Sequence, residues 1–145
     1  MKKNNKGFTL VELIVVLVIL AILAAILVPT LLGYIDRARA EKDYSTAQTV
    51  RVAAQAEIDQ MYGDSTAATI DTFKGVLAQD TATYGQKVYD LSGVSSTVVT
   101  EFKFAYKKGV IIEGYVKINN SYYKLDSTTG QWSVVTTAPT INTPS

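Results

Sequence analysis

The sequence predicts an α+β protein, in which one long N-terminal helix packs against a C-terminal antiparallel sheet of about four strands. Three patterns in the 145-residue chain lead to this prediction. Residues 13–35 form an uncharged apolar run, residues 40–61 carry apolar side chains at steps of three or four, and residues 97–135 alternate with a period of two. The first two patterns are helical, and the third is typical of strands that bury one face.

The chain begins with a short basic segment, residues 1–7, which we interpret as a leader. It contains Lys2, Lys3 and Lys6 and no acid, so the positive-inside bias keeps this end in the cytoplasm. The apolar helix within residues 8–35 is long enough for a hydrocarbon core of about 30 Å. It is longer than the ~7–15 residues of a secretory signal core, and its small residues lack the A-x-A cleavage spacing. We therefore expect a membrane-spanning helix, and a simple N-terminal anchor remains an alternative.

One acid, Glu12, lies inside this apolar segment. A carboxylate carried into hydrocarbon costs at least about 2.5–3.5 kcal/mol unless it is paired or neutral. A local explanation is available, because Thr9 and Glu12 have the spacing of a helix capping box and an acid complements the helix dipole there. A second explanation is a partner cation, and the two can hold at different stages of the protein's life.

Residues 6–13, with the sequence KGFTLVEL, and the long aliphatic helix after them resemble the leader and N-terminus of type IV pilins. The resemblance implies that a prepilin peptidase cuts after Gly7 and then N-methylates Phe8. It also implies that Glu12 pairs with the Phe8 ammonium of a neighbouring subunit in a homopolymer. The implied partners are the prepilin peptidase, a platform protein and an assembly ATPase, and the implied fold is pilin-like.

Pro29 lies within the predicted apolar helix, and Gly33 follows one turn later. Proline cannot donate a hydrogen bond to the Ala25 carbonyl, and glycine adds backbone freedom. We expect a helix break at these two residues. A kink and a local melting inside a fibre are both compatible with the sequence.

The helical pattern continues through residues 36–62 as an amphipathic half of the same helix. Charges begin at Asp36, and Gly63 is a stop signal. The predicted helix therefore runs from about Phe8 to about Tyr62. Its apolar stripe, which should pack on the sheet, consists of Ala40, Tyr44, Ala47, Val50, Ala54, Ile58 and Met61.

Residues 63–95 are expected to connect the helix to the sheet as a packed surface loop. Ile70, Phe73 and Leu77 have helical spacing, so we predict a short helix near residues 69–79.

The sheet is predicted within residues 96–135, where short turns between the strands imply an antiparallel meander. The remaining residues, 136–145, should form a flexible tail. The expected strands cover approximately residues 97–106, 110–118, 122–125 and 131–135.

Composition argues against several functional classes. The chain has no Cys and no His, which excludes disulfides, thiol nucleophiles, His–Cys zinc sites and His-based acid–base catalysis. We expect no enzyme activity, no cofactor and no metal, and we interpret residues 126–130 as a turn rather than a Ca²⁺ loop. The net charge of +1 becomes negative when the leader lysines are removed, so no nucleic-acid partner is expected.

The sequence favours a major pilin of a type IV pilus that serves adhesion and motility. It would lie in the cytoplasmic membrane as a single-pass, N-in protein before assembly and in an extracellular surface pilus afterwards. The absence of Cys departs from disulfide-stapled pilins and favours a system of the Gram-positive type. The alternatives are a pseudopilin or competence-type pilin, which has the same N-terminus, and a monomeric membrane-anchored binding domain.

Overall fold

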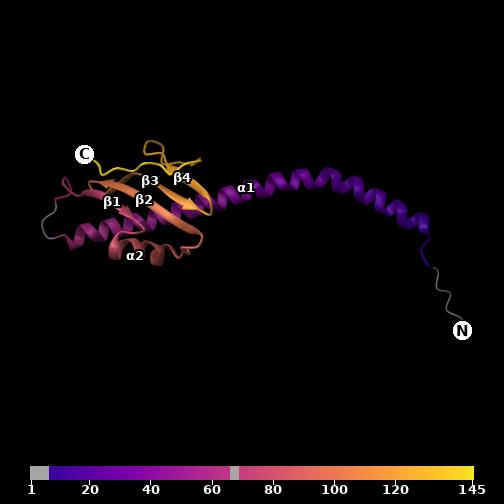
Figure 1. Ribbon diagram of the computed structural model, residues 1–145, viewed down its shortest axis with the longest axis horizontal. Helices are drawn as coiled ribbons and strands as arrows, with labels where there is room; N and C mark the ends of the chain where they lie inside the picture. The colour runs from indigo at the N-terminus through magenta and orange to yellow at the C-terminus, as the bar shows by residue number, and fades with distance from the viewer. Residues whose placement is uncertain (1–6, 66–68) are drawn as a thin grey trace, which may run out of the picture. The chain divides into compact units, whose positions relative to one another are not determined.

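A computed structural model describes residues 7–65 and 69–145, and it confirms the α+β fold (Figure 1). The chain divides within its long helix into two compact units, residues 1–40 and 41–145. The predicted leader falls almost entirely on residues 1–6, which lie outside the described residues. The elements in chain order are α1 (Leu10–Asp64), β1 (Lys74–Ala78), α2 (Ala82–Ser92), β2 (Val99–Lys107), β3 (Val110–Ile118), β4 (Ser121–Leu125) and β5 (Trp132–Val135).

The sheet has five strands in the order β1-β2-β3-β4-β5, and every neighbouring pair is antiparallel. Strands β2 to β5 are the predicted meander, while β1 was not predicted. β1 pairs with β2 from Lys74 opposite Lys107 to Ala78 opposite Lys103. The sheet therefore contains one strand more than the sequence indicated.

The short helix predicted near residues 69–79 is wrong. Strand β1 occupies residues 74–78, and the short helix of this region is α2, at residues 82–92. Three apolar residues at helical spacing are too few to decide the state of so short a segment, and pairing with β2 decides it. Leu77 packs in the main core while Val76 packs in a separate cluster, as alternate residues of a strand do.

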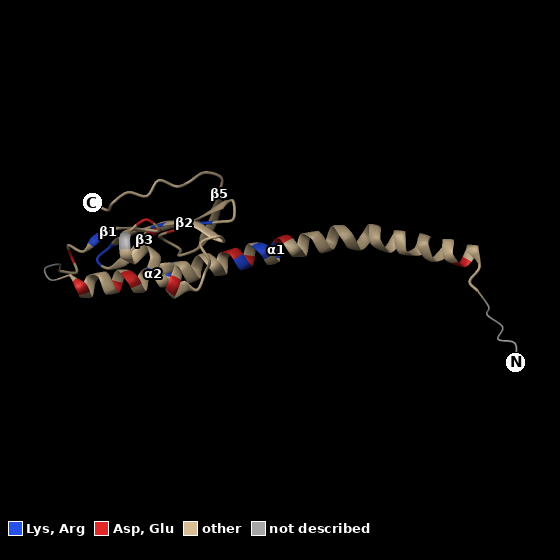
Figure 2. Ribbon diagram, turned by 60° about the horizontal axis from the view of Figure 1, so that its bottom comes forward, with Lys and Arg blue, Asp and Glu red and all other residues tan. Residues whose placement is uncertain are grey.

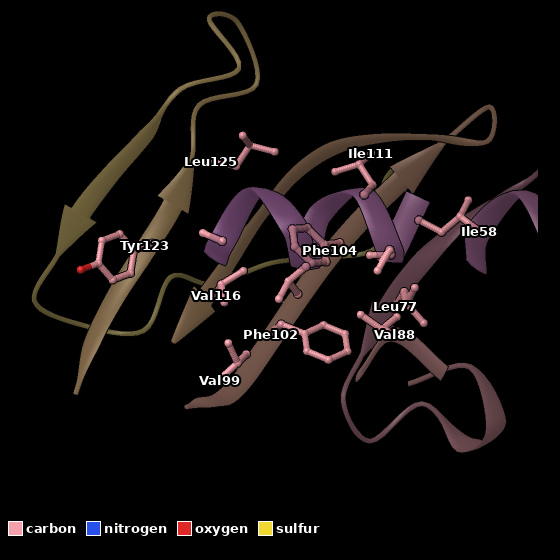
Figure 3. Packing of buried hydrophobic residues seen from close by; sticks show 14 of the residues in the cluster. Ile58, Leu77, Val88, Val99, Phe102, Phe104, Ile111, Val116, Tyr123 and Leu125 are labelled. Atoms are coloured by element: carbon pink, nitrogen blue, oxygen red, sulfur yellow. The ribbon is translucent and has the colours of Figure 1, made fainter. Parts of the chain in front are cut away.

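Apart from Ala40, the predicted stripe of α1 packs against the sheet, as expected. Val50, Ala54 and Ile58 are fully buried and belong to one core with Phe102 and Phe104 of β2. Figure 3 shows Ile58 and the rings of Phe102 and Phe104 among the side chains of this core. At about 1.5–3 kcal/mol for each large apolar side chain, burial of this stripe is the main force that holds the helix on the sheet.

Glutamine side chains supply long-range hydrogen bonds that the sequence did not reveal. Gln55 of α1 donates from Nε2 to the Gly109 carbonyl at 2.6 Å, and its Oε1 accepts from the Ile111 N–H at 3.0 Å. Gln48 accepts from the indole N–H of Trp132 at 3.1 Å. These bonds attach the β2–β3 turn and the last strand to α1 in a chain that has no disulfide.

The tail expected to be flexible packs on the outer face of the sheet. Ile141 is 4% exposed and lies in a small cluster with Ala105 and Tyr115. Lys107 also donates from Nζ to the Ser145 carbonyl at 2.8 Å. The tail is held because the outer face of β2 and β3 carries apolar side chains that Ile141 covers.

Candidate functional site

Helix α1 begins with a reciprocal capping box. The Thr9 N–H donates to Glu12 Oε2 at 2.8 Å, and the Glu12 N–H donates to Thr9 Oγ1 at 3.3 Å. Each bond satisfies a backbone donor that has no partner within the helix. The carboxylate of Glu12 is therefore already engaged by the start of its own helix, as the spacing predicted.

Gly7 and Phe8 immediately precede this cap and have no regular secondary structure. Phe8 is 86% exposed, and no neighbouring atom lies within 4 Å of the place where a Cβ on Gly7 would sit. The peptide bond between them is therefore an exposed, non-helical bond next to a capped helix. A protease needs such access, because it binds its substrate backbone in an extended form.

The apolar part of α1 carries no charge between Glu12 and Asp36, as Figure 2 shows along the helix. Its large apolar side chains are exposed in the single chain, and its most apolar 18-residue window has a mean hydropathy of 3.3. Among the described residues, α1 is the one helix long and apolar enough to cross a membrane. An exposed surface of this kind needs lipid or protein to cover it.

Pro29 and Gly33 do not break α1 in the single chain. The helix is continuous through both residues, and Thr30 donates from Oγ1 to the Leu27 carbonyl at 2.8 Å. Proline removes only one bond of the helix ladder, and the bonds on either side keep the helix intact. The helix is not interrupted at these residues in the single chain, and a kink and local melting in a fibre both stay predictions.

Among the described residues, no group of three or more His, Cys, Asp or Glu side chains is placed to hold a metal ion. The loop after β4 is the turn that the sequence suggested. Asp126 Oδ1 accepts hydrogen bonds from the N–H groups of Thr129 at 2.9 Å and Thr128 at 2.8 Å. These backbone donors lower the pKa of Asp126, because they favour its charged form.

The structure thus brings Gly7, Phe8, Thr9 and Glu12 together at one helix end and leaves Pro29 and Gly33 several turns away. Residue Glu57, which sequence reasoning did not single out, is a second notable acid on α1. It is 2% exposed at the contact with α2. Its burial comes from the packing of α2 on α1, which no local sequence pattern indicates.

Comparison with known families supports the N-terminal assignment. Residues 2–28 match the prokaryotic N-terminal methylation motif, which spans the basic segment, the capping box and most of the apolar run. No curated protein and no solved structure matches the chain. The chain therefore carries a prepilin signal of the type IV pilin kind, which implies processing by a prepilin peptidase and membrane anchoring before assembly.

Proposed function

We propose that this chain is the major structural subunit of a type IV pilus, which serves adhesion and motility. The observation that carries the proposal is the methylation motif at residues 2–28, joined to a helix that has Glu12 in its first turn and no charge over residues 13–35. An α+β unit follows, in which α1 packs on an antiparallel sheet.

Processing takes place at the exposed bond between Gly7 and Phe8. The peptidase removes residues 1–7 from the cytoplasmic side and then methylates the new amine of Phe8. The capping box lies just beyond the scissile bond, so the helix start keeps its hydrogen bonds after the cut.

Cleavage creates a cation one helical turn before Glu12. In the fibre, this ammonium pairs with the Glu12 carboxylate of a neighbouring subunit, where both groups are desolvated. Either charge alone would be costly to bury, while the pair is near neutral and fixes the axial register. A carboxylate has about four acceptor positions, so Oε1 can bind the ammonium while Oε2 stays with the Thr9 N–H.

Polymerisation then covers the apolar run of α1. The same surface of each subunit meets a different surface of the next, and a heterologous contact that does not close into a ring produces a filament. A platform protein and an assembly ATPase extract subunits from the cytoplasmic membrane and add them to the growing surface fibre.

The first experiment is mass spectrometry of the N-terminus of the protein made in a host with its processing enzymes. We expect a chain that begins with N-methyl-Phe8. An intact Met1, or a new terminus near Ala25, would refute the proposal.

The second experiment separates the two roles of Glu12 with a pair of variants. Glu12→Gln keeps a side chain that can complete a capping box and removes the charge, so processing should continue while sheared fibres fall at least tenfold. Thr9→Ala removes the Oγ1 acceptor, which costs about 1 kcal/mol at the helix start, and keeps the charge, so fibres should form. Normal fibres from Glu12→Ala at matched expression would contradict the pairing. Electron microscopy of the fibres distinguishes a long pilus from a short pseudopilus.

A further inference from the structure

A hollow of about 230 Å³ lies on α1 at the end of its apolar run. The residues that line it are Thr30, Gly33, Tyr34 and Arg37. Their spacing is i, i+3, i+4 and i+7, which places all four on one face of a helix. They belong to the compact unit of residues 1–40, so the hollow is a local feature of the helix surface. We call it the notch.

Gly33 leaves the centre of the notch open. Apart from the adjoining helix backbone, no atom lies within 4 Å of the position that a Cβ on Gly33 would take. Side chains on an α-helix lean toward its N-terminus, so the side chain of Arg37 is directed back over the turn that contains Gly33. A larger side chain at position 33 would fill this space.

Tyr34 and Arg37 supply hydrogen-bond donors to the notch. Tyr34 is 69% exposed, and Arg37 is also exposed. Within residues 7–65 and 69–145, neither of the ion pairs that the structure contains includes Arg37. A guanidinium presents its N–H groups in a planar fork that fits the oxygen atoms of a phosphate, and a phenol can donate one hydrogen bond more. The notch is therefore suited to a phosphate group.

The position of the notch along α1 matches the headgroup layer of a bilayer. The helix is continuous from Leu10, and the charge-free stretch between Glu12 and Arg37 is visible in Figure 2 except for Asp36 near its end. At about 1.5 Å per residue, Glu12 and Arg37 are about 37 Å apart along the axis. A hydrocarbon core is about 30 Å thick, or about 40–45 Å with its headgroups. With Glu12 at one interface, the notch lies at the other, where Tyr side chains are enriched.

An apolar surface leads away from the notch toward the middle of the span. Ile26 and Leu27 lie one turn before Thr30 and are 65% and 62% exposed. An acyl chain that is joined to a phosphate in the notch can lie along these two side chains, whereas a free phosphate would leave them uncovered. The surroundings of the notch therefore favour a lipid over a soluble anion.

We propose that the notch binds one phospholipid with a negatively charged headgroup, in the leaflet at the C-terminal end of the span. Arg37 binds the phosphate, the Tyr34 hydroxyl donates to a second lipid oxygen, and the glycerol backbone enters the space over Gly33. Charge complementarity supports this occupant, because Arg37 is the first cation after the apolar run. The inference uses the membrane anchoring of the chain and goes beyond the proposed function.

The test measures which lipid stays bound to the full-length protein. The protein is placed in nanodiscs with equal amounts of phosphatidylglycerol and phosphatidylcholine, released in mild detergent and analysed by native mass spectrometry. We expect one bound phosphatidylglycerol, retained at least fivefold more often than phosphatidylcholine. Inorganic phosphate in the buffer should leave this ratio unchanged, and displacement by inorganic phosphate would overturn the lipid as occupant.

Two substitutions, each with a matched control, locate the site. Arg37→Gln should lower phosphatidylglycerol retention at least fivefold. Its control is Arg39→Gln, which removes the same charge two positions later, nearly on the opposite side of the helix and outside the notch; retention should stay within twofold of wild type. Gly33→Leu should lower retention as much as Arg37→Gln, because it fills the notch without changing the charge. Ala21→Leu adds the same side chain away from the notch and should have less than a twofold effect.

The contrary outcomes are distinct. Equal losses from Arg37→Gln and Arg39→Gln would indicate a general attraction of cations to an anionic surface and would overturn the site, as would normal retention by Gly33→Leu. A chain that stays in membranes and prefers neither lipid would remove the site and leave the pilus function intact. A chain recovered outside the membrane before assembly would remove both.

Discussion

The Lys87 ammonium lies 4.0 Å from Oε2 of Glu57, a carboxylate oxygen that has no hydrogen-bond partner among the described residues. The Glu57 side chain is 3% exposed and the Lys87 side chain is 36% exposed. Breaking a buried ion pair by removing one partner leaves an uncompensated charge, whereas removing both charges is often neutral or stabilising. The perturbation is therefore Lys87→Met, compared with Glu57→Gln and with the double variant.

The expected loss of stability follows from the distance between the two charges and from the unequal exposure of the Glu57 and Lys87 side chains. Two unit charges 4 Å apart attract by about 1 kcal/mol in water and about 4 kcal/mol at an effective dielectric of 20. Because Lys87 is partly solvated, Lys87→Met should lower the free energy of unfolding by about 2 kcal/mol. Glu57→Gln removes the buried charge itself, so it and the double variant should be within about 1 kcal/mol of wild type.

Trp132 provides the assay, because it is the one Trp in the sequence and lies in the unit of residues 41–145. Its indole packs edge-on against Phe104 with ring centroids 6.4 Å apart, so its fluorescence reports unfolding of this unit. Full-length protein in detergent is unfolded with urea, and the three variants are compared with wild type. A Lys87→Met variant as stable as the double variant would show that the Glu57 charge does not need Lys87.

Three further outcomes are expected with the same Trp132 assay. Gln55→Ala should cost about 2 kcal/mol, since it removes two hydrogen bonds to the β2–β3 hairpin; a loss below about 0.5 kcal/mol would contradict that role. Burial, and the 2.7 Å hydrogen bond from the Tyr123 hydroxyl to Asp43 Oδ2, raise the pKa of Tyr123. This contribution to stability is complete below the unfolded pKa of about 10 and is lost as pH rises toward the higher folded value. Unfolding followed from pH 8 to 12 should therefore show a smaller alkaline loss for Tyr123→Phe than for wild type. Ile141→Ala should cost about 2 kcal/mol and speed proteolysis of the tail, and an unchanged cleavage rate would show that Ile141 does not anchor it.

The parts of the fold that the sequence predicted correctly have long, regular patterns. The stripe of α1 recurs over several turns, and the alternation in β2 and β3 continues for nine residues each. β1 has five residues, too few to show a period, and its state depends on pairing with a strand about 30 residues later. Ile141 stands alone in a polar tail, so only the apolar outer face of the sheet reveals its role.

The contrast between local patterns and long-range contacts also applies to the candidate site. The capping box joins residues three positions apart, and local spacing is enough to predict it. Glu57 becomes a buried acid only because α2 closes over it, and Gln55 finds its partners more than fifty positions away. Contacts of this range depend on the complete fold and leave no signal in a local pattern.

Glu12 and Glu57 are two acids on one helix, and their negative charges are balanced in different ways. Glu57 faces a lysine of the same chain, so its charge is balanced as soon as the chain folds. In the described residues, Glu12 receives a hydrogen bond from the Thr9 N–H, which stabilises the carboxylate but does not neutralise it. In the proposed pilus, its counter-charge does not exist until the bond between Gly7 and Phe8 is cut. Processing then changes the electrostatics of assembly as well as the length of the chain. The precursor has the same apolar helix but lacks the ammonium, so moving it from lipid into a fibre would bury an unpaired carboxylate. In the proposed pilus, this cost would keep the uncut chain in the membrane and would make cleavage the step that permits polymerisation.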